Sequence, residues 1–219
     1  MDYCEFPEGS YTSYMAKKAV IFYGAPGAGK GTQAENLAGV TGYIHFDSGR
    51  YIEAAINDPE KQNDPVVKRQ KKLFLSGKLC DPDWIGAIVK DHIREFADHH
   101  DGLVFSGSPR TTREAFGTKK DKGVIGLLEE KYGVDNIVVF FLEIPVVESV
   151  KRNSKRGRPG LDEPKVIRIR CKEYKKLTLP IVKKLREKKI KVFKIDGKPS
   201  PKAVSREIMK LFKEFSKGK

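Results

Sequence analysis

The sequence predicts an α/β domain in which a five-stranded parallel sheet carries helices on both of its faces. Short runs rich in β-branched and aromatic residues alternate with charged, helix-like segments along the chain, which is typical of a parallel sheet wound on both sides. The first run, AVIFY, ends in a glycine-rich turn. A length of 219 residues suits one domain with small insertions.

Each expected strand is a short apolar run of the kind that forms a buried parallel strand. The five runs are AVIFY at 19–23, YIHF at 43–46, LVFS at 103–106, IVVFFLEI at 137–144 and KVFKI at 191–195. The segment after the first strand predicts a helix that begins in the glycine-rich turn and ends near Gly39 or Gly42. Residues 1–15 lack periodicity and predict a flexible arm before a domain over 16–219.

Two further helical segments follow the second strand. Charged helical sequence over 50–72 is broken around Asp58 and Asp64, each of which precedes a proline. A small helical insertion is therefore predicted over about residues 48–77. The segment DPDWIGAIVKDHIREFADHH predicts another helix with Asp81 or Asp83 as its N-cap.

The composition limits the kind of protein and the compartment. No run of about 18 apolar residues exists, so no membrane span is expected, and the first residues lack the apolar core of a secretory signal. Cys4, Cys80 and Cys171 are scattered without a C-x-x-C pair, which favours a reducing, cytoplasmic setting and argues against a zinc site. The net charge of +14 fits either attraction of polyphosphates or nucleic acid, or a solvated lysine-rich surface. For the lysine-rich tail the solvated surface is favoured.

The stretch YGAPGAGKGTQ at 23–33 is a glycine-rich loop between a predicted strand and a predicted helix. This context lets backbone N–H groups and the helix N-terminus converge on phosphate oxygens, with Lys30 as a point charge. The hydroxyl that usually follows the lysine arrives one residue late, because Gly31 precedes Thr32. The loop therefore predicts a phosphate-binding site with an altered surrounding for a metal ion.

The segment GAPGAGKGTQ resembles the loop of adenylate kinases and related nucleoside monophosphate kinases, G-x-P-G-x-G-K-G-T-Q. The resemblance extends over most of residues 17–213 and implies a P-loop three-layer fold with a small monophosphate-binding insertion and a short lid. The ATP contacts that it implies in this loop are Gly27, Ala28, Gly29, Lys30, Gly31 and Thr32.

Three more segments resemble the parts of that family that bind the acceptor nucleotide: YIHFDSGRYIEAA, SGKLCDPDWIGAIVK and VFSGSPRTTREA. Together with the arginine cluster below, they imply acceptor contacts at Ser48, Arg50, Leu79, Cys80, Gly107, Arg110, Glu114, Arg158 and Arg170. A planar Arg110 guanidinium can clamp a phosphate bidentately.

Several positions depart from the family pattern. Glu53 stands where the family has an arginine for the acceptor phosphate, and Arg50 either replaces it or pairs with Glu53 on the surface. Ser106 stands where an acid orients water around magnesium, and Glu114 stands where a glutamine contacts the acceptor base. Because guanine offers two donors on that edge, a carboxylate there favours GMP more than usual.

The segment FLEIPVVESVKRNSKRGRPGLDEPKVIRIRCKEY resembles the family's arginine-rich lid. The resemblance implies that Arg152 covers the donor base and that Arg156 contacts the transferring phosphoryl group. Arg158 and Arg170 fall on the two remaining phosphate-contacting positions, and Lys198 lies beside the donor adenine. The lid over about 156–166 is too short for the zinc-bearing version, so no zinc is expected.

The expected function is phosphoryl transfer from ATP to AMP, giving two ADP, with Lys30, Arg110, Arg156, Arg158 and Arg170 as the catalytic cations. GMP or a pyrimidine monophosphate as acceptor, another P-loop small-molecule kinase, and a nucleotide- or RNA-binding protein without catalysis stay open as alternatives. The expected partners are ATP and a nucleoside monophosphate, without membrane or nucleic acid, and the expected state is a monomer. Magnesium is expected with ATP. Asp47 either approaches it through water or only caps the following helix.

Overall fold

The computed structural model describes residues 17–98 and 102–217. The expected arm over residues 1–15, and His99 and His100 at the end of the helix expected over DPDWIGAIVKDHIREFADHH, lie outside these residues. Five strands of the described chain form one parallel sheet in the order β2-β3-β1-β4-β5. Their bounds are β1 (Lys18–Gly24), β2 (Ile44–Asp47), β3 (Gly102–Ser106), β4 (Ile137–Glu143) and β5 (Lys191–Asp196). The predicted five-stranded parallel α/β fold is confirmed.

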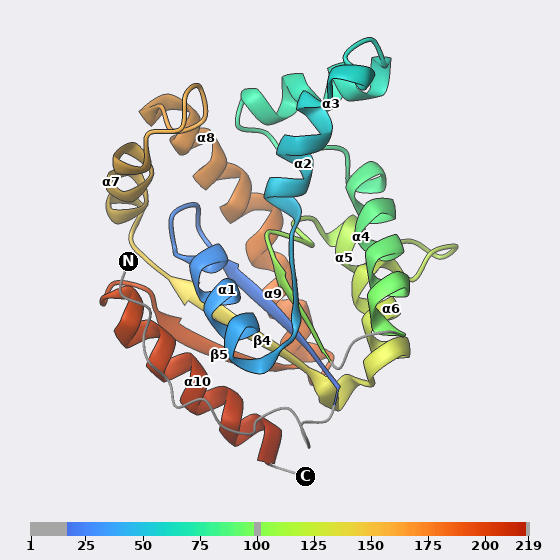
Figure 1. The fold of residues 1–219 in the computed structure, drawn as a ribbon, viewed down its shortest axis with the longest axis vertical. Helices are drawn as coiled ribbons and strands as arrows, with labels where there is room; N and C mark the ends of the chain where they lie inside the picture. The colour runs from blue at the N-terminus through green and yellow to red at the C-terminus, as the bar shows by residue number, and fades with distance from the viewer. Residues whose placement is uncertain (1–16, 99–101, 218–219) are drawn as a thin grey trace.

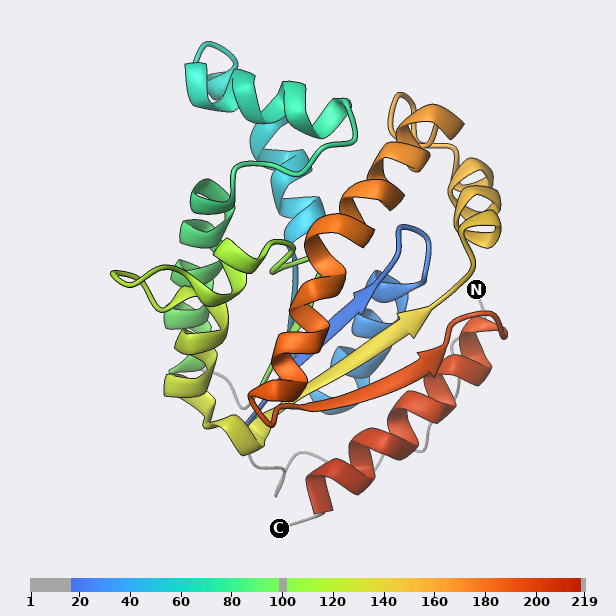
Figure 2. The ribbon, with the colours of Figure 1, turned by 180° about the vertical axis from the view of Figure 1, so that it is seen from behind.

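Helices cover both faces of this sheet (Figures 1 and 2). The α-helices are α1 (Lys30–Thr41), α2 (Ser48–Asn57), α3 (Pro65–Leu75), α4 (Pro82–Ala97), α5 (Thr112–Phe116), α6 (Gly123–Tyr132), α7 (Val146–Arg156), α8 (Pro164–Glu173), α9 (Leu179–Glu187) and α10 (Pro201–Lys217). Two 3-10 turns are η1 (Pro59–Lys61) and η2 (Val134–Asn136), and η3 (Tyr174–Thr178) is a π-helical segment between α8 and α9. None of the helices in the described part of the chain is long and apolar enough to cross a membrane.

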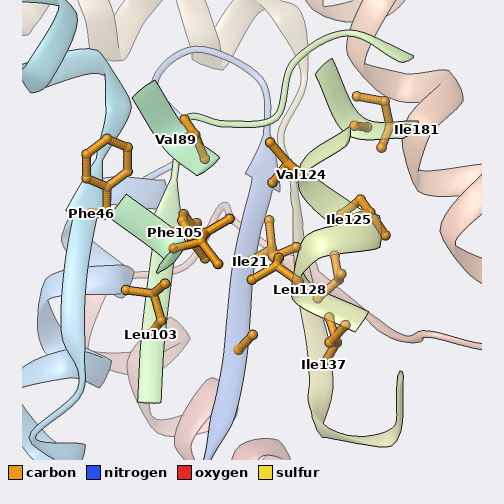
Figure 3. Packing of buried hydrophobic residues seen from close by; sticks show 14 of the residues in the cluster. Ile21, Phe46, Val89, Leu103, Phe105, Val124, Ile125, Leu128, Ile137 and Ile181 are labelled. Atoms are coloured by element: carbon orange, nitrogen blue, oxygen red, sulfur yellow. The ribbon is translucent and has the colours of Figure 1, made fainter. Parts of the chain in front are cut away.

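The alternation of side chains along β1 builds two hydrophobic layers. Phe22 stacks on Phe140 with ring centroids 5.4 Å apart, and this layer is closed by α1 and α10. Ile21 points to the opposite face, where α4, α6 and α9 contribute buried residues such as Leu128 and Ile181 (Figure 3). The central strands β1 and β4 are therefore buried on both faces, and they are apolar except for Lys18 near the start of β1 and Glu143 at the end of β4.

Aspartates mark where helices of the predicted insertion, and the helix that follows it, begin. Asp58 caps η1, Asp64 caps α3 and Asp81, rather than Asp83, caps α4. The segments α2, η1 and α3 rise on one side of the molecule and α7 and α8 on the other, above the end of the sheet to which the strands point (Figure 1). Helix α1 ends at Gly42, rather than at Gly39, with φ of 72°.

Candidate active site

A cavity of about 550 Å³ opens at the carboxyl ends of the strands, which is where open parallel sheets bind ligands. Its walls come from the phosphate loop, α2, the loop after β3, and α7 and α8. Most of the predicted site residues line it: Gly27, Gly29, Lys30, Gly31, Thr32, Asp47, Arg50, Leu79, Gly107, Arg110, Arg152, Arg156, Arg158 and Arg170. Ala28, Ser48, Cys80 and Glu114 are buried behind this surface, and Lys198 is exposed on the loop after β5.

Helix α7 supports the phosphate loop from behind. Ser149 Oγ donates to the carbonyl of Pro26 at 2.5 Å, and Asn153 Nδ2 donates to the carbonyl of Ser149 at 2.7 Å. Gly27 has φ of 77°, and a Cβ there would lie 2.5 Å from Asn153 Nδ2, so only glycine fits. The loop is therefore bonded to α7 through Ser149 and lies against Asn153, and both of these polar residues are fully buried.

Lys30 begins α1 and folds back onto the loop that precedes it. Its ammonium donates to the carbonyls of Gly24 at 2.9 Å and Ala25 at 3.0 Å. Burial, together with the positive charges of Arg110 and Arg170, lowers the pKa of Lys30 to about 7. An anionic ligand beside Lys30 would favour the charged form of its ammonium group.

The carboxylate of Asp162 accepts hydrogen bonds from three arginines, two at the end of α7 and after it and one on α8. It accepts hydrogen bonds from Arg156 at 2.6 and 2.8 Å, from the backbone and Nε of Arg158 at 3.1 and 3.4 Å, and from Arg170 at 3.4 Å. Burial raises the pKa of Asp162, but the bonds from Arg156 and Arg158 outweigh it and hold the pKa well below its ordinary value. Burial and the neighbouring Arg110 lower the pKa of Arg170 to about 10.

Arg50 and Glu53 leave α2 toward different partners. Arg50 Nη2 lies 2.6 Å from Glu35 of α1, and its side chain is 71% exposed. Glu53 Oε2 lies 3.6 Å from Arg158 Nη1, so it joins the insertion to the lid region. The surface pair between Arg50 and Glu53, one of the two expected arrangements, is thus replaced by two other pairs.

Asp47 ends β2 and stands beside Ser106 in the register of the sheet. Its Oδ1 accepts hydrogen bonds from the backbone of Gly49 at 2.8 Å and Arg50 at 3.3 Å, so it is the N-cap of α2. Its Oδ2 faces the phosphate loop, since a Cβ at Gly31 would lie 3.5 Å from it. The hydroxyl of Ser106 is engaged with His45 Nε2 at 2.8 Å.

Glu114 turns inward instead of lining the cavity. Its Oε1 accepts from the hydroxyl of Ser108 and its Oε2 from the backbone N–H of Arg110 at 2.8 Å. Burial raises its pKa, and the bonds from Arg110 and Ser108 oppose that shift. With both oxygens engaged inside the protein, this arrangement does not favour the predicted contact with an acceptor base.

Several residues of the cavity wall were not expected from the sequence, among them Tyr23, Glu35, Asn153, Tyr174 and Thr178. The Tyr23 hydroxyl is buried without a hydrogen-bond partner in the described residues. Asn153 and Thr178 carry polar groups within otherwise helical segments, and that polarity was the available signal. Within the same residues, no group of three or more histidine, cysteine, aspartate or glutamate side chains could hold a metal ion.

Arg152 binds the loop after β5, where Lys198 is located. Arg152 Nη1 donates to the carbonyl of Gly197 at 2.8 Å and its Nη2 to that of Lys198 at 3.1 Å. A phosphate loop at the end of a parallel sheet, facing a ring of cations, defines a P-loop phosphotransferase.

Comparison with known proteins gives the family. The family model described as adenylate kinase matches residues 22–190. An adenylate kinase of Prochlorococcus marinus (strain AS9601) is 32% identical over 76% of this chain and 83% of its own length. One of Sinorhizobium medicae (strain WSM419) is 30% identical over 88% of this chain and 98% of its own length. The chain belongs to the adenylate kinase family, and it is a phosphotransferase with nucleoside monophosphate kinase activity.

Proposed function

We propose that the protein transfers a phosphoryl group from ATP to AMP and releases two molecules of ADP. The observation that carries the proposal is the cavity itself, in which Lys30 faces four arginines across about 550 Å³. Phosphoryl transfer requires alignment of two phosphates and neutralisation of the moving group, and little covalent chemistry. Five cations from three separate segments supply that neutralisation.

We assign the two substrates to opposite sides of the cavity. The ATP phosphates lie on the loop from Gly27 to Thr32, with its adenine between Arg152 and the loop at Gly197 and Lys198. The acceptor phosphate lies against Arg110, Arg158 and Arg170. Arg156, held by Asp162, contacts the group in transfer.

The same assignment places the acceptor nucleoside near α2, Leu79 and the loop after β3. Leu79 lines the cavity and Cys80 is buried behind it. Ser48 is fully buried, its hydroxyl 3.5 Å from the carbonyl of Ser106, and it supports this wall. Arg50 is mostly exposed and paired with Glu35, so we assign the acceptor phosphate to the other arginines.

Magnesium would accompany ATP, as it generally does in this family, and would neutralise phosphate charge. The residues present fit such an ion, because Asp47 Oδ2 faces the loop at Gly31. Magnesium keeps several of its waters and usually needs one or two carboxylates nearby. We assign this part to Asp47, whose oxygen would orient water from the end of β2 in place of the acid that the family has at Ser106.

A coupled turnover assay with ATP against AMP, GMP, CMP and UMP tests the proposal. We expect AMP to give the highest kcat/KM. The Lys30→Ala and Arg110→Ala variants should each lose several orders of magnitude in turnover while they keep a cooperative thermal transition. Retention of more than about a tenth of wild-type turnover by either variant would contradict the roles assigned to them.

GMP is the second acceptor to consider, because a carboxylate at Glu114 would suit its donors. The inward orientation of Glu114 weakens that argument. The monomeric state, the cytoplasmic location and the absence of a nucleic-acid partner stay predictions.

A further inference from the structure

The backbone of Arg110 is held from two sides, by hydrogen bonds to the side chains of Glu114 and Thr178. On one side, the backbone N–H of Arg110 donates to Glu114 Oε2 at 2.8 Å. On the other, the carbonyl of Arg110 accepts from Thr178 Oγ1 at 2.8 Å. The two anchors come from α5 and from η3, which lie far apart in sequence.

Glu114 closes the loop on itself as well. Its second oxygen accepts from the hydroxyl of Ser108, and its own N–H donates to the hydroxyl of Thr111, the N-cap of α5, at 3.1 Å. The carboxylate is thus engaged by both ends of the turn from Ser108 to Arg110. Since Glu114 is 4% exposed, these bonds are made away from water, where loss of an acceptor is costly.

Thr178 connects the same loop to the helix that carries Arg170. It is the last residue of the π-helical segment η3, which continues from α8, and such segments often occur at functional sites. The hydroxyl of Thr178 therefore connects the backbone of Arg110 to the helical segment that carries Arg170.

We propose that Glu114 and Thr178 are positioning residues for Arg110, and that Glu114 has exchanged contact with the acceptor base for this task. The inference rests on the proposed role of Arg110 at the acceptor phosphate. A guanidinium is useful in phosphoryl transfer only if its fork is aimed correctly, and a displacement of about 1 Å can cost about 100-fold in rate. Fixing both backbone groups of Arg110 limits such displacement.

Arg110, Ser108 and Tyr23 interact with Glu114, and these interactions determine which variants test the proposal. Burial raises the pKa of Glu114, and Arg110 opposes that shift. Burial also raises the pKa of Tyr23, and the charge of Glu114 raises it further. Glu114→Gln keeps a carbonyl oxygen for the Arg110 N–H and an amide that can donate to Ser108. Glu114→Leu has similar bulk and removes both acceptors.

The experiment compares these variants in two independent measurements. The first is steady-state kinetics with ATP, AMP and GMP. We expect Glu114→Leu to lower kcat/KM for AMP roughly 10- to 100-fold, while the KM for ATP stays unchanged. Glu114→Gln should retain most of the turnover and the wild-type ratio of AMP to GMP. A changed ratio in Glu114→Gln would show contact with the base and overturn the proposal.

The second measurement is amide hydrogen exchange of Arg110 in the protein without ligand. Its protection should fall in Glu114→Leu and persist in Glu114→Gln. Because this measurement needs no turnover, it separates the two ideas. A wild type inactive toward AMP would contradict the proposed function, whereas unchanged Arg110 protection in Glu114→Leu would contradict the present inference.

A double-mutant cycle and a variant on the other anchor complete the test. In an Arg110→Ala background, Glu114→Leu should have little further effect, because it acts through Arg110; additive losses would overturn the inference. If Glu114→Leu does not fold, Thr178→Val decides. It should reduce turnover, with rescue by Thr178→Ser. Thr41→Val is the matched control, since Thr41 makes the same 2.8 Å bond to the carbonyl of Leu37 at the far end of α1.

Discussion

At the scale of single residues, the carboxylate of Asp47 is divided between two neighbours. One oxygen caps α2 and the other faces Gly31 of the phosphate loop. The two expected roles of Asp47, helix cap and magnesium neighbour, are therefore compatible. The register of β2 with β3 explains how Asp47 can take the place of an acid at Ser106, since the two residues stand side by side at the same edge of the sheet.

Asp47→Asn separates these two roles, because Asn caps a helix as well as Asp does. We expect metal-free ATP to bind as tightly or more tightly, since a negative charge near the triphosphate is gone. The ratio of the ATP Kd without magnesium to the Kd with magnesium should fall by roughly 3- to 10-fold. Titration calorimetry of ATP with and without magnesium measures this ratio.

The matched control for Asp47→Asn is Asp64→Asn. Asp64 caps α3 through bonds of 2.7 and 3.3 Å to Val66 and Val67, and it lies outside the cavity wall. Its ratio should equal that of the wild type. Adding Ser106→Asp to Asp47→Asn should recover part of the lost preference for magnesium. An unchanged ratio in Asp47→Asn would leave Asp47 with the helix cap alone.

The lowered pKa of Lys30 predicts that the protein takes up a proton when it binds ATP. In the unliganded protein the pKa of Lys30 is lowered to about 7 from its ordinary value of 10.5, so above pH 7 much of the unliganded protein carries neutral Lys30. Bound phosphates favour the charged form and raise this pKa. At about pH 8, ATP binding should therefore take up as much as about one proton.

Calorimetry in buffers of different ionisation enthalpy measures that proton, and Lys30→Met should lack it. Binding without proton uptake in the wild type would contradict the prediction. The same shift acts on folding. Between about pH 7 and pH 10 the unfolded chain binds more protons at Lys30 than the folded one, so the contribution of Lys30 to stability rises with pH through this window.

At the scale of elements, α2 and the lid region are joined before any substrate is present. Glu53 of α2 pairs with Arg158 at 3.6 Å, and Asp162 holds the same arginine from within the lid. An acceptor phosphate on Arg158 would have to share it with these carboxylates. Glu53 thus occupies, as an anion, the region where the family supplies a cation.

Glu53→Gln should lower the KM for AMP, because it frees Arg158 for the phosphate. The pair is partly exposed, so its loss is worth about 0.2–1 kcal/mol, or about 1.5- to 5-fold in KM. The KM for ATP should not change. Glu129→Gln, which breaks a pair with Lys188 at 2.8 Å outside the cavity wall, is the control. A higher KM for AMP in Glu53→Gln would show that Glu53 assists acceptor binding.

At the scale of the whole molecule, the sheet gathers distant segments at one edge. β1, β2 and β3 each end in a residue or loop of the cavity, and α7 and α8 close it from the far side of β4. The arginines of the cavity lie at this edge, and the net charge of +14 favours association with anions. Two hydrophobic layers keep the strands, and so the site, in place.

The sequence by itself predicted the fold, and most of the site residues that it predicted line the cavity. Apolar runs at strand length, aspartate before proline, and a glycine-rich loop with Lys30 are local signals, and local backbone chemistry decides what they form. The strand positions and the phosphate loop follow from such signals, whereas most of the other residues expected in the cavity were implied by the resemblance to a known family. The family itself was predicted by the resemblance of GAPGAGKGTQ, extended by the acceptor segments and the arginine-rich segment.

Only the tertiary structure decided which polar groups meet. Arg50 pairs with Glu35, Glu53 with Arg158, and Glu114 turns toward the backbone of Arg110. The pairs made by Arg50 and Glu53 join segments that the order of strands and the packing of helices bring together, whereas the bond between Glu114 and Arg110 spans only four residues. The physical reason is that a buried carboxylate must find donors wherever the fold places them, so its role depends on its neighbours in space.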